Sequence, residues 1–202
     1  MHKVPMTAIL LAGGQSSRMG CDKARLPYGQ QTILEHLVDL LGSIFEETFV
    51  IVNNRGRYKD LSLQRACVFE DLIGNGGPMA GIYTGLSYAL HPESVVLTCD
   101  MPLVDREMIF YLLDHWTKNY DVLCFKNSLG KWEPFPAVYR RSCRDLMRSL
   151  LVRGHGSMRE LLEIARVKSL PLRSQQAASL ANINYPEDYA RILEEQKLCP
   201  RV

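Results

Sequence analysis

Short apolar runs alternate along this chain with longer stretches in which apolar residues recur every three or four positions. The runs predict buried strands, and they are Ala8–Ala12, Phe49–Val52, Ala66–Phe69, Val95–Cys99, Val122–Phe125, Pro136–Tyr139 and Val167–Leu170. The periodic stretches predict helices over residues 33–45, 78–90, 106–116, 141–152, 158–166 and 186–197. Strands that alternate with helices are typical of a mainly parallel sheet covered on both faces. We therefore predict a three-layer αβα fold of the Rossmann-like α/β class, with Pro136–Tyr139 at the edge of its sheet.

Local signals mark where several of these helices begin. Thr32 and Glu35 have the spacing of a capping box, with Thr32 as the N-cap. Pro78 and Pro186 suit the first turn of a helix, because proline brings no N–H and its φ is already helical. Asp105 is expected to cap the helix that follows it.

The composition is that of an ordinary soluble protein, and we expect residues 1–202 to form a single domain. The chain has 47% hydrophobic and 23% charged residues, and its net charge is +2. Its 24 basic and 22 acidic residues are mixed along the sequence, which argues against a nucleic-acid partner. No apolar run approaches the roughly 20 residues of a membrane span, and the amino terminus lacks a signal-peptide pattern. We therefore expect no membrane partner and a cytoplasmic location.

The six cysteines are scattered, which argues against a zinc site and against disulfides. Cys67, Cys99 and Cys124 lie within apolar runs and are expected to be core thiols.

Four predicted strands end in glycine or in a polar residue that can bind a ligand. These ends are Gly13–Gly14, Asn53, Asp71 and Asp100. In open α/β sheets ligands bind at the carboxyl ends of the strands, so these residues should surround one crevice. A single Asn or Asp at such a place is often only a turn former. Four of them beside a glycine-rich loop favour a binding site.

The loop after the first strand has the features of a phosphate-binding segment. Its glycines allow close approach of the backbone, and the N–H groups of residues 12–16 together with Arg18 and Lys23 can hold anionic oxygens. The spacing does not match G-x-x-x-x-G-K-[ST], and G-x-G-x-x-G is absent. A P-loop kinase and a nicotinamide-dependent dehydrogenase are therefore both disfavoured.

The same residues resemble a known signature. Leu11–Gly14, Ser17–Gly20 and Asp22–Lys23 look like the motif of nucleotidyltransferases that activate small phosphorylated compounds. Within that group the chain resembles the molybdenum cofactor guanylyltransferases, which join GMP from GTP to the phosphate of molybdopterin. Further similar segments follow in the same order, namely Gly77–Gly81, Cys99–Pro102, Glu133–Pro134 with Ala137–Tyr139, Ser157–Leu162 and Asn182–Asp188.

The resemblance implies a role for individual residues. It places the nucleotide at Leu11, Ala12, Gly13, Gly14, Lys23, Asn53, Asp71 and Asp100. It implies Mg²⁺ on Asp100, and Lys23, Arg18 and Asp100 as the candidate catalytic residues. The candidates for the acceptor side are Gly77, Pro78, Glu133, Arg159, Asn182 and Asn184. The implied partners are GTP, molybdopterin and a molybdoenzyme or its chaperone. Transfer of CMP or another nucleotide to molybdopterin or a different small phosphorylated acceptor remains the alternative.

Two positions bear on the details. Relatives that use CTP tend to have alanine where Gly13 stands, so a missing Cβ would leave room for a purine. The family usually has threonine before the proline of its C-terminal motif, whereas this chain has Tyr185. A helix cap is thereby lost, and either Asn184 replaces it or the tyrosine ring has a packing role.

Overall fold

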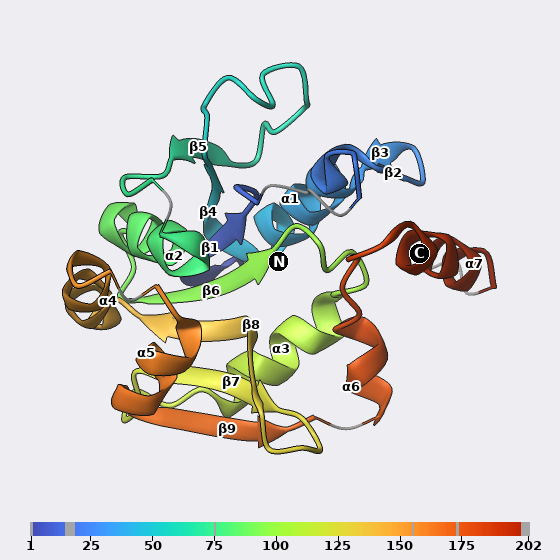
Figure 1. Ribbon diagram of the computed structural model, residues 1–202. Coiled ribbons are helices and arrows are strands. Elements are labelled where there is room, and N and C mark those ends of the chain that lie inside the picture. The colour runs from blue at the N-terminus through green and yellow to red at the C-terminus, as the bar shows by residue number, and fades with distance from the viewer. Residues whose placement is uncertain (1, 15–18, 75, 155, 173, 199–202) are drawn as a thin grey trace.

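The computed structural model describes residues 2–14, 19–74, 76–154, 156–172 and 174–198, built around one seven-stranded sheet (Figure 1). The strand order is β5-β4-β1-β6-β8-β7-β9. Only β8 among these strands runs antiparallel to its neighbours. The strands are β1 (Val4–Leu11), β4 (Phe45–Val52), β5 (Cys67–Glu70), β6 (Glu93–Thr98), β7 (Val122–Lys126), β8 (Trp132–Arg140) and β9 (Val167–Pro171), with a small separate hairpin of β2 (Pro27–Tyr28) and β3 (Gln31–Thr32).

Helices cover both faces of this sheet, which confirms the predicted three-layer α/β fold. One face carries α2 (Gly77–Tyr88), α4 (Cys143–Val152) and α5 (Met158–Ile164), and the other carries α1 (Ile33–Ile44) and α3 (Arg106–His115). Alternate residues of β1 serve the two cores, because successive strand side chains point to opposite faces. Leu10 packs in the core with α1, and Ile9 packs in the core with α2. Three shorter or later elements complete the chain, namely the 3₁₀ turn η1 (Lys23–Arg25), α6 (Ser174–Ser179) and α7 (Pro186–Leu198).

The expected helix starts are confirmed. The Thr32 hydroxyl accepts a hydrogen bond from the N–H of Glu35 at 3.3 Å, and the Glu35 carboxylate accepts one from the N–H of Thr32 at 2.9 Å. The Asp105 carboxylate accepts the N–H of Met108 at 2.9 Å. Each bond satisfies an amide that the first turn of a helix leaves without a partner.

The expected edge position of Pro136–Tyr139 is wrong, because β8 lies inside the sheet between β6 and β7. Residues 137–140 pair with β6, and the pairing with β7 shifts register between Leu123 and Phe125. Pro134 and Pro136 lie in this irregular stretch. Proline lacks the N–H that a regular ladder needs, so an interior strand can accept it where the ladder is interrupted.

The expectation for the cysteines is correct for Cys124, which is fully buried, and wrong for Cys67, which is exposed. Cys67 begins β5, and β5 is an edge strand whose outer side has no neighbour in the described sheet. Cys99 is partly buried, and Cys143, outside the apolar runs, is buried.

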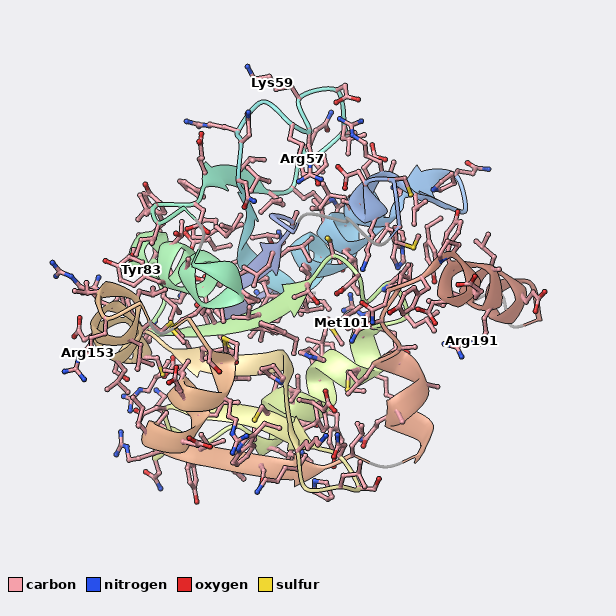
Figure 2. All side chains as sticks on the ribbon, in the orientation of Figure 1. Arg57, Lys59, Tyr83, Met101, Arg153 and Arg191 are labelled. Atoms are coloured by element: carbon pink, nitrogen blue, oxygen red, sulfur yellow. The ribbon has the colours of Figure 1, made fainter. Side chains whose placement is uncertain are left out.

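The chain between β4 and β5 makes an excursion over residues 53–66 that stands above the sheet in Figure 1. Lys59 points away from the molecule at the tip of this excursion (Figure 2). Tyr58 is only 4% exposed and packs into the core beside α1. None of the helices in the described ranges is long and apolar enough to cross a bilayer.

Candidate active site

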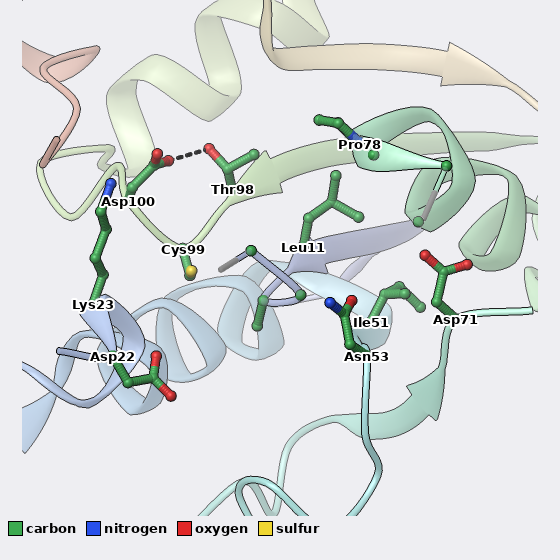
Figure 3. A pocket seen from close by; sticks show the side chains of 16 residues that line it. Leu11, Asp22, Lys23, Ile51, Asn53, Asp71, Pro78, Thr98, Cys99 and Asp100 are labelled. Atoms are coloured by element: carbon green, nitrogen blue, oxygen red, sulfur yellow. Dashed lines mark hydrogen bonds between the residues drawn. The ribbon is translucent and has the colours of Figure 1, made fainter. Parts of the chain in front are cut away.

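A pocket of about 520 Å³ opens at the carboxyl ends of β1, β4, β5 and β6 (Figure 3). This volume lies in the range of small-molecule sites. The predicted crevice is confirmed, because the residues that follow these four strands all line it. Ten of the residues singled out in the sequence lie in its wall, namely Leu11, Ala12, Gly13, Gly14, Lys23, Asn53, Asp71, Gly77, Pro78 and Asp100.

Lys23 and Asp100 lie at one end of the pocket. The Lys23 side chain rises from η1 and points towards the Asp100 carboxylate in Figure 3. The Thr98 hydroxyl donates to Asp100 Oδ1 at 2.6 Å, which orients the carboxylate. Lys23 Nζ also donates to Asn184 Oδ1 at 3.4 Å. A cation and a carboxylate thus line the same end of the pocket, where a phosphate chain and a metal ion can meet.

Asn53 and Asp71 lie at the other end, directly after β4 and β5. A Cβ placed on Gly13 would lie 2.3 Å from Asn53 Oδ1, so the missing Cβ of this glycine is what admits the Asn53 amide. Asp71 Oδ1 accepts the hydroxyl of Thr84 at 2.8 Å and the N–H of Ile73 at 3.1 Å. The Asp71 carboxylate is therefore oriented by the fold before any ligand binds.

One backbone N–H group of the predicted phosphate loop is engaged within the sheet, and residues 15 and 16 of that loop lie outside the described residues. The N–H of Ala12 donates to the carbonyl of Ile51 at 2.8 Å and so extends the pairing of β1 with β4. It is therefore not available to an anion. The N–H groups of Gly13 and Gly14 remain in the described part of the predicted loop.

The donor set suits Mg²⁺ better than a metal that needs several protein ligands. Within the described ranges no group of three or more His, Cys, Asp or Glu side chains is placed to hold a metal ion. Mg²⁺ keeps several waters and is usually bound through one or two carboxylates plus substrate phosphates. Asp100, with one oxygen engaged by Thr98, fits that pattern.

The chain matches a known family over most of its length. The model of the MobA-like NTP transferase domain matches residues 8–174. The chain belongs to this family. It is therefore a nucleotidyltransferase, as the resemblance of its loop motif indicated.

Individual MobA-like relatives agree with this assignment. A probable molybdenum cofactor guanylyltransferase of Carboxydothermus hydrogenoformans is 36% identical over 196 residues, which cover 94% of this chain and 95% of the relative. One of Clostridium perfringens is 28% identical over 205 residues, covering 96% and 100%. The crystal structure of molybdopterin-guanine dinucleotide biosynthesis protein A from Archaeoglobus fulgidus has a TM-score of 0.81 and 25% identity, covering 98% of this chain and 100% of that one.

Five residues that the resemblance singled out do not line the pocket or lie outside the described residues, and one of them is Asn184 in the C-terminal motif. Glu133, on β8, accepts the Asn127 amide at 2.8 Å. The Arg159 side chain on α5 is 81% exposed and pairs with Glu163. Asn182 is exposed in the segment before α7. Arg18 lies outside the described residues.

The start of α7 is capped differently from both expectations for the C-terminal motif, which were capping by Asn184 and packing of the Tyr185 ring. Asp188 Oδ2 accepts the N–H groups of both Asn184 and Tyr185 at 2.9 Å, and so caps α7 from its first turn. The side chain of Asn184 is thereby left to contact Lys23, and the Tyr185 ring is 50% exposed. The N–H of Ile183 donates to the carbonyl of Asp100 at 2.9 Å, which joins this motif to the end of β6.

Among the other residues of the pocket wall, Asp22, Thr98 and Cys99 had no predicted binding or catalytic role, although Asp22 and Cys99 stand in segments that carry the resemblance. Removal from water is the main cause that raises the pKa of the Cys99 thiol to about 12, and the nearby Asp100 carboxylate adds to it. The thiol therefore stays protonated. The one usable signal for Asp22 is its place directly before Lys23, since Asp is a favoured N-cap residue.

Proposed function

We propose that the protein transfers the GMP part of GTP to the terminal phosphate of molybdopterin, giving a guanine dinucleotide cofactor and pyrophosphate. The names of the relatives that match nearly the whole chain support the substrates. The observation that carries the proposal is that Lys23 and Asp100 both line one end of a pocket built by the strand ends of an NTP transferase.

The attacking group needs no general base. A phosphate monoester has a second pKa near 6, so it is mostly dianionic at neutral pH. The pocket agrees with this chemistry. Its thiol, Cys99, is protonated, with a pKa of about 12, and is unsuited to act as a nucleophile.

The task of the protein is to bring two anions together and to stabilise charge on the departing pyrophosphate. We assign Lys23 and the N–H groups of Gly13 and Gly14 to the β- and γ-phosphates, with Arg18 as a second cation. Asp100 would hold Mg²⁺, which supplies further positive charge at the phosphate oxygens.

The opposite end of the pocket suits the nucleoside. We assign Asn53 and Asp71 to the ribose or the base, where the Asp71 carboxylate can accept hydrogen bonds from the N–H groups of guanine. Gly77 and Pro78, at the start of α2, are assigned to the acceptor side. A dithiolene product is sensitive to oxygen, so we expect direct delivery to a molybdoenzyme or its chaperone, in the cytoplasm.

The test is release of pyrophosphate when the protein is incubated with molybdopterin, Mg²⁺ and a single NTP at a time. We expect release with GTP and a dinucleotide product of the corresponding mass. Lys59→Ala serves as the control for Lys23→Ala, because it removes a lysine whose side chain points away from the molecule. Release with CTP and not with GTP would replace GMP by CMP transfer. No release with any NTP would contradict the proposed activity.

A further inference from the structure

Asp22 precedes Lys23 and lines the pocket, yet the proposed reaction gives it no task. Its side chain is 19% exposed and has partners on both oxygens. Oδ1 accepts the N–H of Ala24 at 3.2 Å, which caps η1, and the hydroxyl of Tyr58 at 3.1 Å. Oδ2 accepts Nε of Arg57 at 2.9 Å. The turn that carries Lys23 is thus fixed through one carboxylate.

Two partners of Asp22, Arg57 and Tyr58, come from a distant part of the chain, the excursion between β4 and β5. They also contact the glycine loop. The Tyr58 hydroxyl lies 3.3 Å from the carbonyl oxygen of Ala12, and Arg57 Nη1 lies 3.4 Å from that of Gly14. Lys59, on the same excursion, points away from the molecule in Figure 2. The contacts join the excursion, the glycine loop and η1 into one unit.

A carboxylate in the wall of a pocket for a polyanion has a cost. Unless it is compensated, it repels the phosphates that Lys23 attracts. Arg57 lies against Asp22 and compensates its charge. If Asp22 had no other effect, its removal would strengthen triphosphate binding. If Asp22 holds Lys23 in place, its removal would weaken that binding, so the sign of the change separates the two cases.

We propose that Asp22, held by Arg57 and Tyr58, is a positioning residue that fixes Lys23 for the β- and γ-phosphates and so makes the pocket prefer nucleoside triphosphates over monophosphates. This inference rests on the proposed function. A 3₁₀ turn of three residues has few bonds of its own. The Asp22 cap, with its tie to the buried Tyr58, supplies the rigidity that a flexible lysine side chain needs at its base.

The experiment compares the affinity for Mg²⁺–GTP with that for GMP by calorimetry, without molybdopterin. Asp22→Asn and Tyr58→Phe should each weaken the affinity for Mg²⁺–GTP about tenfold, which corresponds to about 1.4 kcal/mol. The affinity for GMP should stay within about twofold of the wild-type value. Tyr58→Phe removes a single oxygen atom and keeps the buried ring, so it stays informative if Asp22→Asn folds poorly. Asp39→Asn is the matched control, because it makes the same change at an exposed ion pair with Arg65.

A double-mutant cycle with Lys23→Ala tests whether Asp22 acts through the lysine. In that background Asp22→Asn should cause no further loss of GTP affinity. Tighter GTP binding by Asp22→Asn, an equal loss for GTP and GMP, or an undiminished loss in the Lys23→Ala background would each overturn the inference.

The proposed function fails separately from this inference. It fails if the wild-type protein releases no pyrophosphate from any NTP in the presence of molybdopterin and Mg²⁺. If the wild type binds GTP better than GMP, and Asp22→Asn and Tyr58→Phe both keep that preference, only the role of Asp22 is wrong.

Discussion

Replacement of Gly13 by alanine probes the contact between the glycine loop and Asn53. The new Cβ would lie 2.3 Å from Asn53 Oδ1 and 3.2 Å from its Cγ, so the amide must move by about 1 Å, which amounts to a change of rotamer. Asn53 is exposed, and its side chain has room to turn. We expect the free energy of unfolding to fall by about 1 kcal/mol at most, or about 2–4 °C in Tm.

The effect on the nucleotide should be larger than the effect on stability. A displaced Asn53 would lose the hydrogen bonds to the nucleoside that the proposed function assigns to it, and each such bond contributes about 0.5–1.5 kcal/mol. Gly13→Ala should therefore weaken GTP about 2- to 10-fold, and the ratio of GTP to CTP affinity should fall because the larger base has lost space. Calorimetric titration with each Mg²⁺–NTP measures both quantities.

Two further variants identify the cause. A Cβ on Gly14 would meet no atom of the described residues within 4 Å, so Gly14→Ala is the control for stability. Addition of Gly13→Ala to Asn53→Ala should cost little beyond Asn53→Ala alone, because the side chain that clashes is already gone. Unchanged GTP affinity in Gly13→Ala would refute the reasoning, since the displaced amide would then have no part in binding.

Three other predictions follow from single contacts. Lys23→Ala should lower turnover by orders of magnitude with circular dichroism unchanged, and a rate near that of the wild type would contradict its role. Gly85→Ala should lower the free energy of unfolding, measured by chemical denaturation, by about 1–2 kcal/mol, because its Cβ would lie 2.6 Å from the buried Ile9 side chain. This clash outweighs the better helix propensity of alanine. Addition of Ile9→Val to Gly85→Ala should restore part of the loss. Hydrogen bonds from Arg166 hold the pKa of Asp121 below its usual range. Asp121→Asn should therefore destabilise the protein at neutral pH, and progressively less as the pH falls below about 4. A difference in unfolding free energy between variant and wild type that stays constant down to pH ~2 would contradict this.

Features that depend on neighbouring residues were predictable from the sequence. The capping box of Thr32 and Glu35 and the N-cap of Asp105 need only a few residues, and the structure has both. The crevice also followed, because parallel strands place their carboxyl ends at one edge whatever the details of packing. Asn53 and Asp71 reach one pocket for that reason.

Features that depend on contacts between distant segments were not predictable. The interior position of β8 depends on where its register with β7 shifts, which the local pattern of two prolines does not reveal. Likewise, Arg57 and Tyr58 are separated from Asp22 by more than thirty residues, and only the folded excursion brings them together. The cap of α7 came from Asp188, inside the helix, because Tyr185 has no acceptor suited to that place.

The most direct test of the account is the identity of the nucleotide that the protein attaches to molybdopterin from an equimolar mixture of GTP, CTP, ATP and UTP with Mg²⁺. Mass spectrometry of the product identifies the base. The account predicts the guanine dinucleotide as the main product, formed together with pyrophosphate and absent with Lys23→Ala. A cytosine dinucleotide as the main product, or none at all, would contradict it.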